Sequence, residues 1–364
     1  MLDEFLMQMR PYFGDMERKA LSQYDFENNF VTEFKETEKF EKRLAQILKI
    51  KSATAVNNGT IALSIAALSV GIKPNDEVLI PNFTMIATPN ALKMIGAVPI
   101  FTDIELDTWC IDKSEIEKKL SPKTKAVVLV SANGRYPTYN VDELRESLNS
   151  KGVKLIEDAA QGLGSTYPDG SAIGTKGNVA TLSFSAPKII STGQGGLVFS
   201  RDSKIIEKAR KIKDFGRDGG GVDVHPTFGI NSKFTDLQAI IGCCQLDQLS
   251  DRIKRRKIQH KLYERLLKNI NEITFPKNDY VNTTPWFSEI ITQDREELAV
   301  FLKENNIGTR SVYPEINRQG VYNTSEIHSN SNYISSSGLW LPSHMGVTDD
   351  HIHFICSKIK NYFG

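Results

Sequence analysis

The chain has few cysteines, almost no net charge and no long hydrophobic run in its 364 residues. Its 45 basic and 44 acidic residues leave a net charge of +1, so we expect no attraction to nucleic acid or to a membrane surface. No run approaches the ~20 apolar residues of a membrane-spanning helix. The N-terminus carries acidic residues early and lacks the apolar core of a signal peptide.

The four cysteines form no pattern that binds a metal or builds a disulfide framework. We expect them to be reduced and mostly buried thiols of a cytoplasmic protein: Cys110, Cys243, Cys244 and Cys356. The remaining composition is ordinary for a globular protein, with 24% charged and 40% hydrophobic residues. A chain of this length buries a substantial core and is expected to split into two domains.

Helical and extended patterns alternate over the first two thirds of the chain. Apolar runs of strand length, such as 77–81 and 153–158, are separated by amphipathic or apolar segments of helix length, such as 59–71 and 140–152. Strands that are apolar throughout are covered on both faces. The pattern therefore predicts an α/β domain with a mostly parallel, mixed sheet flanked by helices.

The last third of the chain mixes shorter strands with helices. Residues 236–268 read as one long helix or two joined helices that lead out of the first domain. We expect a large α/β domain at 1–250 and a smaller α+β domain at 251–364. The segment 323–338 is rich in Ser and Asn and is predicted to be an exposed loop.

Two polar sites follow predicted strands of the large domain, where ligands of open α/β sheets bind. Asn58, Gly59 and Thr60 open a helix, whose free amides suit a phosphate. The alternative is an ordinary helix cap. Asp158 ends a buried strand and needs a partner, for which a cationic ring nitrogen would serve. The alternative for Asp158 is an N-cap of the next turn.

Lys188 stands alone among small and apolar residues, between the apolar runs 180–184 and 195–199. Partial burial lowers the pKa of a lysine and makes its amine a nucleophile for an aldehyde. The alternative is an exposed lysine on a loop. A phosphate-binding helix start, a strand-end Asp and a nucleophilic lysine together are what pyridoxal phosphate requires.

Several motifs of the chain resemble those of the DegT/DnrJ/EryC1/StrS sugar aminotransferases, which are fold-type I pyridoxal-phosphate enzymes. The resemblance extends over nearly the whole chain. It is carried by "NNGTIAL", "LIEDAAQGLGSTYPDGSAIGTKG", "LSFSAPKIISTGQGGLV" and "GINSKFTDLQAIIGCCQLDQL". The stretch "KIISTGQGG" is most similar to enzymes that aminate a nucleotide-linked 4-keto-6-deoxyhexose, such as GDP-perosamine synthases.

The resemblance implies a role for each matching residue. Lys188 would attach the cofactor covalently and later move the proton, and Asp158 would pair with the ring nitrogen. Gln161 would lie near the ring hydroxyl. Asn231 would reach the phosphate from a neighbouring subunit, so the working unit would be a homodimer with a composite active site. The remaining cofactor contacts would be Asn58, Gly59, Thr60, Ser183 and, over the ring, Met85.

The chain departs from the family pattern around the substrate. Met85 stands where many relatives have an aromatic residue, and Ser131 and Asn133 replace a histidine and a tyrosine. L-glutamate is the donor that the resemblance implies. The acceptor would be a GDP-, dTDP- or UDP-linked keto-deoxysugar used for surface polysaccharides. Candidate contacts for this anionic acceptor are Arg217, Lys233, His225 and His344.

Three alternatives share this fold and cofactor. One is dehydration of the sugar, and another is amination of a 3-keto sugar. The third is a non-catalytic, cofactor-binding regulatory protein, because function depends on the site rather than on the fold. The related dehydratases have a histidine in place of the lysine, so Lys188 favours transamination.

Overall fold

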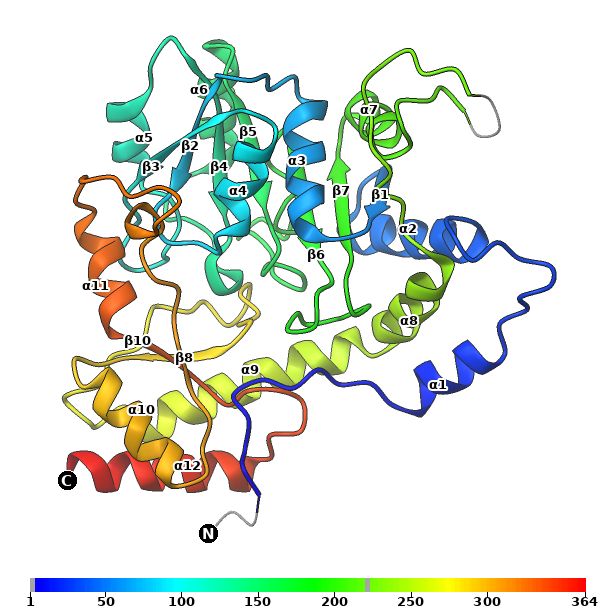
Figure 1. The fold of residues 1–364 in the computed structure, drawn as a ribbon. Helices are drawn as coiled ribbons and strands as arrows, with labels where there is room; N and C mark the ends of the chain where they lie inside the picture. Colours follow the sequence, from blue (N-terminus) through cyan, green and yellow to red (C-terminus); the bar gives the residue numbers. More distant parts are fainter. Residues whose placement is uncertain (1–3, 220–222) are drawn as a thin grey trace.

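The computed structural model describes residues 4–219 and 223–364, and it contains two β-sheets (Figure 1). The large sheet has the order β1-β7-β6-β5-β4-β2-β3. Its middle strands pair in parallel, whereas β7 pairs antiparallel with both β1 and β6. The predicted α/β architecture is confirmed. The strands are β1 (Ser52–Val56), β2 (Glu77–Pro81), β3 (Val98–Thr102), β4 (Thr124–Val130), β5 (Lys154–Asp158), β6 (Val179–Ser183) and β7 (Gly196–Ser200).

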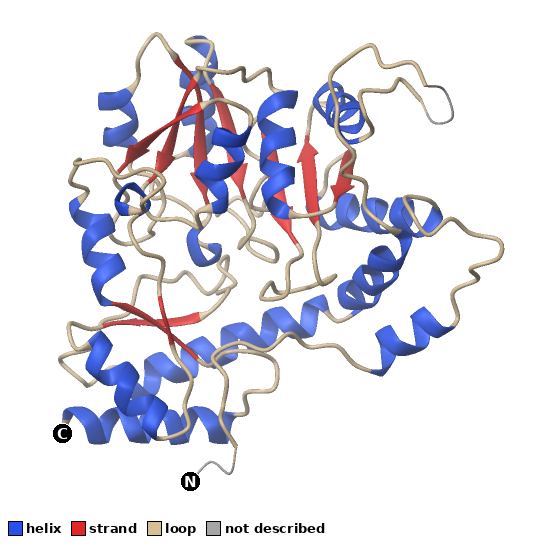
Figure 2. Cartoon of the chain, in the orientation of Figure 1, coloured by secondary structure: helices blue, strands red, loops and turns tan. Residues whose placement is uncertain are grey.

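Helices cover both faces of the large sheet (Figure 2). Alternate residues of one strand face opposite sides, so β4 contributes to two cores. Val128 belongs to the core under α3, α4 and α7, whereas Val127 and Leu129 belong to the core under α2 and α6. These helices are α2 (Lys35–Leu48), α3 (Gly59–Ser69), α4 (Ala87–Met94), α6 (Val141–Ser150) and α7 (Ser203–Lys213), with α1 (Asp15–Ser22), α5 (Lys113–Lys119) and the short η1 (Ala132–Gly134) beside them.

The sheet topology brings six strand ends to one edge. β2, β3, β4, β5 and β6 are parallel, and β1 has the same direction because it is antiparallel to β7, which is antiparallel to β6. The segments that follow these strands therefore lie side by side at their carboxyl ends. This is the edge at which an α/β sheet binds its ligands.

A second, antiparallel sheet of order β8-β10-β9 forms the C-terminal region. The helices α8 and α9 lead from the large sheet into it (Figure 1). The N-terminal segment also belongs here, because Leu6 bridges to Ile307. The division into domains at residue 250 remains a prediction. The elements are α8 (Asp236–Asp247), α9 (Leu249–Leu267), β8 (Ser288–Ile291), α10 (Arg295–Glu304), β9 (Arg310–Ser311), η2 (Ile316–Arg318), α11 (Ser329–Ser337), β10 (Gly338–Leu341) and α12 (Asp349–Phe363).

The prediction of an exposed loop at 323–338 was wrong, because its second half is the helix α11. Asp103, just beyond β3, accepts hydrogen bonds from the backbone amides of Asn330 and Ser331, each at 2.9 Å. A carboxylate from a distant segment thus supplies the acceptor that a helix start needs. The buried Ile334 then anchors the helix. Serine-rich composition gave no hint of this tertiary contact.

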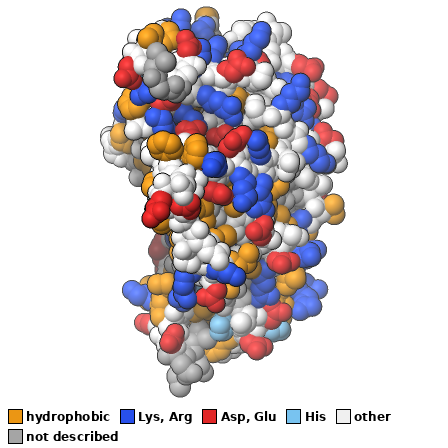
Figure 3. Space-filling model, turned by 90° about the vertical axis from the view of Figure 1, so that its right-hand side faces the viewer, with side chains coloured by type: hydrophobic (Ala, Val, Ile, Leu, Met, Phe, Trp, Pro, Cys, Tyr) orange, Lys and Arg blue, Asp and Glu red, His pale blue; other side chains and the backbone are white. Residues whose placement is uncertain are grey.

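The described surface carries mixed charge. Figure 3 shows basic and acidic side chains interspersed on one face of the molecule, in keeping with the small net charge. Across residues 4–219 and 223–364, no helix is long and apolar enough to cross a membrane. The same residues contain no group of three His, Cys, Asp or Glu side chains placed to hold a metal ion. The four cysteines are free thiols, and three of them are buried.

Candidate active site

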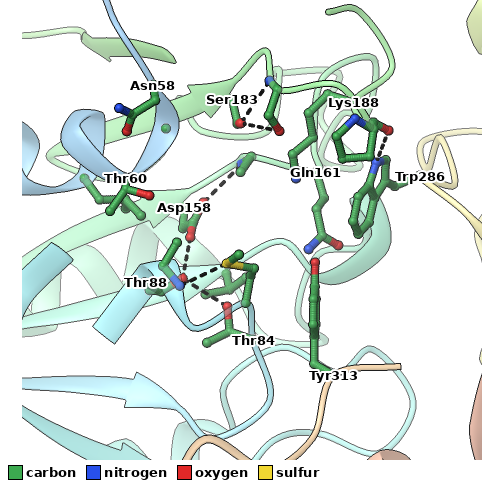
Figure 4. Close-up of a pocket in the computed structure, with 18 of the residues that line it drawn as sticks. Asn58, Thr60, Thr84, Thr88, Asp158, Gln161, Ser183, Lys188, Trp286 and Tyr313 are labelled. Atoms are coloured by element: carbon green, nitrogen blue, oxygen red, sulfur yellow. Dashed lines mark hydrogen bonds between the residues drawn. The ribbon is translucent and has the colours of Figure 1, made fainter. Parts of the chain in front are cut away.

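A cavity of about 480 Å³ lies at the carboxyl edge of the large sheet, where the C-terminal region meets it. Figure 4 shows Asp158, Gln161, Lys188 and Tyr313 around one common space. The cavity brings together eight of the residues that the sequence singled out as cofactor contacts: Asn58, Gly59, Thr60, Met85, Asp158, Gln161, Ser183 and Lys188.

The start of α3 forms one end of the cavity. Asn58 caps the helix, since its Oδ1 accepts the amide of Ile61 at 2.9 Å. A Cβ on Gly59 would lie 2.9 Å from the Cβ of Ser183, so glycine lets the helix start lie directly against β6. Asn58 can therefore cap the helix while the same helix start binds a phosphate, so the two interpretations of this segment are compatible. The first amides of α3, with the hydroxyls of Thr60 and Ser183, fit a phosphate group.

We expect Gly59→Ala to weaken cofactor binding, because the added methyl group pushes α3 away from Ser183. Overpacking of this kind costs enough to lower the affinity for pyridoxal phosphate about tenfold. A titration of the apoprotein, followed by cofactor absorbance, measures this. Gly320→Ala is the control, because a Cβ there meets nothing within 4 Å. Equal affinity in both variants would argue against a phosphate at this helix.

Asp158 forms the floor of the cavity. It is only 5% exposed, and its Oδ2 accepts the hydroxyl of Thr88 at 2.8 Å while its Oδ1 accepts the amide of Ala160 at 3.1 Å. Burial raises the pKa of Asp158, and these hydrogen bonds together with the charge of Lys188 oppose the rise. A buried carboxylate held in a fixed orientation suits a cationic ring nitrogen.

Lys188 reaches the cavity from the loop after β6. Its Nζ lies 4.2 Å from the centroid of the Trp286 ring, and the indole of Trp286 donates to the carbonyl of Pro187 at 2.8 Å. Burial lowers the pKa of Lys188 to about 8, an effect that Asp158 opposes and Arg310 reinforces. A substantial fraction of this amine is therefore neutral near physiological pH, as a nucleophile must be.

The lowered pKa of Lys188 predicts the pH dependence of cofactor capture. Only the neutral amine attacks an aldehyde, so the capture rate should rise about tenfold per pH unit and level off above about pH 8. Stopped-flow absorbance after mixing apoprotein with pyridoxal phosphate measures this rate, and Lys188→Ala supplies the background. A rate that still rises at pH 10 would show that the amine has the pKa of an ordinary lysine.

Several residues of the cavity were missed by the sequence analysis. The sequence held a signal for Thr84 and Thr88, since both follow β2 at the ligand-binding edge and are four residues apart. In the structure their hydroxyl oxygens are 3.0 Å apart. The sequence held no such signal for Trp286, Arg310 and Tyr313, because they come from the C-terminal region. Only the packing of that region against the large sheet brings them to Lys188.

Four predicted contacts lie outside this cavity in the single chain. Arg217 and Lys233 line a second hollow, where Lys233 Nζ is 2.6 Å from Asp214 Oδ1. Asn231 is exposed. His225 is also exposed, and its Nδ1 lies 2.9 Å from the carbonyl oxygen of Phe215. A role for these residues in catalysis stays a prediction.

His344 also lies outside the cavity, and it is buried in the C-terminal region. Its Nδ1 accepts the amide of Gly346 at 3.1 Å, and its carbonyl accepts Gln259 Nε2 at 3.0 Å. Burial lowers the pKa of His344 to about 4, with help from Arg256 and Arg10. The imidazole is therefore neutral at physiological pH and has local structural partners.

Ser131 and Asn133 do not ring the substrate space as expected, because both are buried outside the lining of the cavity. The amide group of Asn133 pairs with the backbone of Phe287, accepting at 2.7 Å and donating at 2.9 Å. Its backbone amide donates to Gln161 Oε1 at 2.7 Å. Asn133 thus ties the residue just before β8 to Gln161 and orients that cavity residue.

Comparison with known proteins agrees with this geometry. The model of the DegT/DnrJ/EryC1/StrS aminotransferase family matches residues 13–360. The chain belongs to this family. It is 33% identical over 330 residues to GDP-perosamine synthase of Escherichia coli O157:H7, with 90% of each chain covered. Its fold matches the aminotransferase TlmJ from Streptoalloteichus hindustanus with a TM-score of 0.91, at 26% identity and 98% coverage of each chain.

A second solved structure is DesI, which was crystallised in the presence of its TDP-sugar product. It matches with a TM-score of 0.90 at 25% identity, covering 99% of this chain and 93% of DesI. The chain is therefore a pyridoxal-phosphate-dependent sugar aminotransferase. When bound, this cofactor supplies an aldehyde for amine exchange and a ring that delocalises negative charge. The helix start at Gly59, the buried Asp158 and the amine of Lys188 fit its three functional groups.

Proposed function

We propose that this aminotransferase moves the amino group of L-glutamate onto a nucleotide-linked keto-6-deoxysugar used for surface polysaccharides. The observation that carries the proposal is the placement of Lys188 and Asp158 in one cavity large enough for a cofactor. The 33% identity to a GDP-perosamine synthase supports a 4-keto sugar as the acceptor. The nucleotide would be GDP or, as in the DesI product, TDP or a related uridine nucleotide.

In this proposal each residue has a defined role. Asp158 keeps a ring nitrogen protonated, and Thr88 holds the carboxylate in place. Lys188 would hold the cofactor covalently and, once the amino donor has displaced its amine, would carry a proton between the substrate carbon and the cofactor carbon. Trp286 fixes the lysine loop through its bond to Pro187. Gln161, oriented by the backbone of Asn133, lines the cavity and would contact the ring hydroxyl.

Arg310 is our candidate for the residue that binds the carboxylate of the amino donor. It lines the cavity, is exposed, and forms no ion pair with an acidic residue in the described part of the chain. Its guanidinium lies 5.5 Å from the ring centroid of Trp340, which holds it at the cavity wall. An exposed arginine in the cavity wall that lacks an ion-pair partner among the described residues supports an anionic donor such as glutamate.

We expect Arg310→Gln to slow the reaction with glutamate about 10- to 100-fold, since a charge-assisted hydrogen bond is lost. The rate of the cofactor absorbance change after adding glutamate measures this half-reaction. Amination of the sugar by pyridoxamine-loaded protein is the second half-reaction and should change less. Arg201→Gln, at another exposed arginine, is the control. Equal losses in both half-reactions would contradict a donor-specific role.

We also propose a homodimer with composite active sites. Asn231 is exposed and outside its own cavity, and Arg217 and Lys233 line a neighbouring hollow. These positions would let a second copy reach the phosphate and the nucleotide. A mixed dimer of Lys188→Ala and Asn231→Ala chains tests this, because one intact site would form. Recovery of activity on mixing two inactive variants supports sharing, and no recovery contradicts it.

The acceptor is identified by a panel experiment. Pyridoxamine-loaded protein is incubated with GDP-, dTDP- and UDP-linked keto sugars, and mass spectrometry detects the sugar that exchanges its ketone for an amine. The proposal predicts amination of one 4-keto-6-deoxysugar. Loss of water from the sugar would indicate a dehydratase, and a 3-amino product would indicate a 3-keto acceptor. A protein whose spectrum does not respond to glutamate would favour the regulatory alternative.

A further inference from the structure

A second, much smaller cavity lies behind the loop that carries Lys188. Its volume is about 10 Å³, and Pro187 and Lys188 line both cavities. The N-terminal segment around Arg10 and two arginines of α9, Arg252 and Arg256, form the other walls. The backbone of the Lys188 loop therefore separates the active-site cavity from a small space lined by cations.

Arg256 is the unusual member of this group. It is 6% exposed, and its side chain forms no hydrogen bond or ion pair within residues 4–219 and 223–364, although its guanidinium lies 6.0 Å from the ring centroid of Phe287. Its Nη1 is fully buried without an acceptor. Burial and the nearby Arg252 lower the pKa of Arg256 to about 9, so the group is still charged at physiological pH. A buried charge without a counter-ion is strongly destabilising, so the site calls for an anion.

Arg252 adds to the positive charge on the same space. It is 3% exposed and donates to the carbonyls of Ile189 at 3.1 Å and Tyr12 at 3.2 Å, while its Nε has no acceptor. Burial lowers the pKa of Arg252, and the negative charge of Glu17 opposes that effect. The carboxylate oxygens of Glu17, however, already accept hydrogen bonds from Gln245 at 2.7 Å and from the Gly14 amide at 2.8 Å.

The other basic groups near Arg256 supply no negative charge to balance its positive charge. His344 lies near both Arg256 and Arg10, and these two cations help to keep the imidazole neutral. Arg10 itself is a further cation on the wall of the small cavity. Among the described residues, no carboxylate lines this space.

We propose that the small cavity binds one halide-sized anion, chloride, beside the guanidinium groups of Arg252 and Arg256. The space holds one small particle, and water would leave the charge of Arg256 uncompensated. Bound chloride would stabilise the Lys188 loop, because Arg252 donates a hydrogen bond to the carbonyl of Ile189, the residue after Lys188. This inference does not depend on the proposed substrate or on the amino donor.

The test compares thermal unfolding of the holoenzyme in chloride and in gluconate at constant ionic strength. A ligand that binds only the folded state raises the melting temperature as its concentration increases. We expect chloride to raise it by about 2–4 °C. Arg256→Met removes the buried charge with a side chain that packs well, so the variant should fold and lose the chloride dependence. Lys254→Met, at an exposed site of α9, should keep it.

Crystals of the holoenzyme soaked in bromide give an independent readout. The proposal predicts an anomalous peak between Arg252 and Arg256 that is absent from Arg256→Met crystals. A water molecule at this position would overturn the proposal. So would a carboxylate from a second copy of the chain, or a melting temperature that responds equally to chloride and gluconate.

Discussion

Replacement of Lys188 by alanine lowers turnover by about four orders of magnitude or more and prevents covalent attachment of the cofactor. In the proposed mechanism the amine is both the nucleophile for the aldehyde and the carrier of the proton, so one substitution would remove both functions. Its surroundings leave no substitute, since the described residues that line the cavity include no second lysine, cysteine or histidine. Steady-state kinetics with glutamate and a keto sugar measure the loss, and cofactor absorbance reports attachment.

Two variants serve as controls for this result. Lys188→Arg keeps a positive charge but not the nucleophile, so it should be as inactive as the alanine variant. Lys204→Ala removes an exposed lysine of α7 and should behave as the parent enzyme. Turnover near the parent level in Lys188→Ala would mean that another group carries the reaction.

The second large effect is expected at Asp158. We expect Asp158→Asn to lower turnover about 10²- to 10⁴-fold, because it removes one partner of a buried charge pair with the cofactor ring. The side chain keeps its shape and its place beside Thr88, so the protein should fold and bind the cofactor. Kinetics measure the loss, and the NMR shift of a labelled ring nitrogen reports whether that nitrogen is protonated.

Asp251→Asn is the matched control for Asp158, because it removes an acid that is exposed on α9. The ring nitrogen should be protonated in the parent enzyme and in this control, and unprotonated in Asp158→Asn. A slow Asp158→Asn enzyme whose ring nitrogen is still protonated would assign the loss to structural disturbance. The role of Asp158 as the partner of the ring nitrogen would then be contradicted.

The cofactor side of the site could be predicted because its residues follow strands of the large sheet. Asn58, Asp158 and Ser183 each stand at or just past a strand end, and parallel strands bring such ends to one edge. Local apolar runs were enough to locate these strands. Lys188 was recognisable because a lone lysine among small residues is unusual in a chain where most lysines lie in charged segments.

The rest of the site depends on contacts between distant segments, which local patterns do not reveal. Trp286 and Arg310 reach Lys188 only through the packing of the C-terminal region against the large sheet. Asn133 was expected near the substrate, but its amide group pairs with the backbone of Phe287 instead. The helix α11 depends on a carboxylate from beyond β3. Each of these features is a tertiary contact between residues far apart in sequence.

The position of covalent attachment tests the assigned chemistry most directly. Borohydride reduction of the pyridoxal-phosphate-loaded enzyme makes the bond between lysine and cofactor permanent, and mass spectrometry of the digested protein then locates it. We predict a single modified peptide that carries the cofactor on Lys188. A cofactor found on another lysine, or on no residue at all, would contradict the role assigned to this cavity.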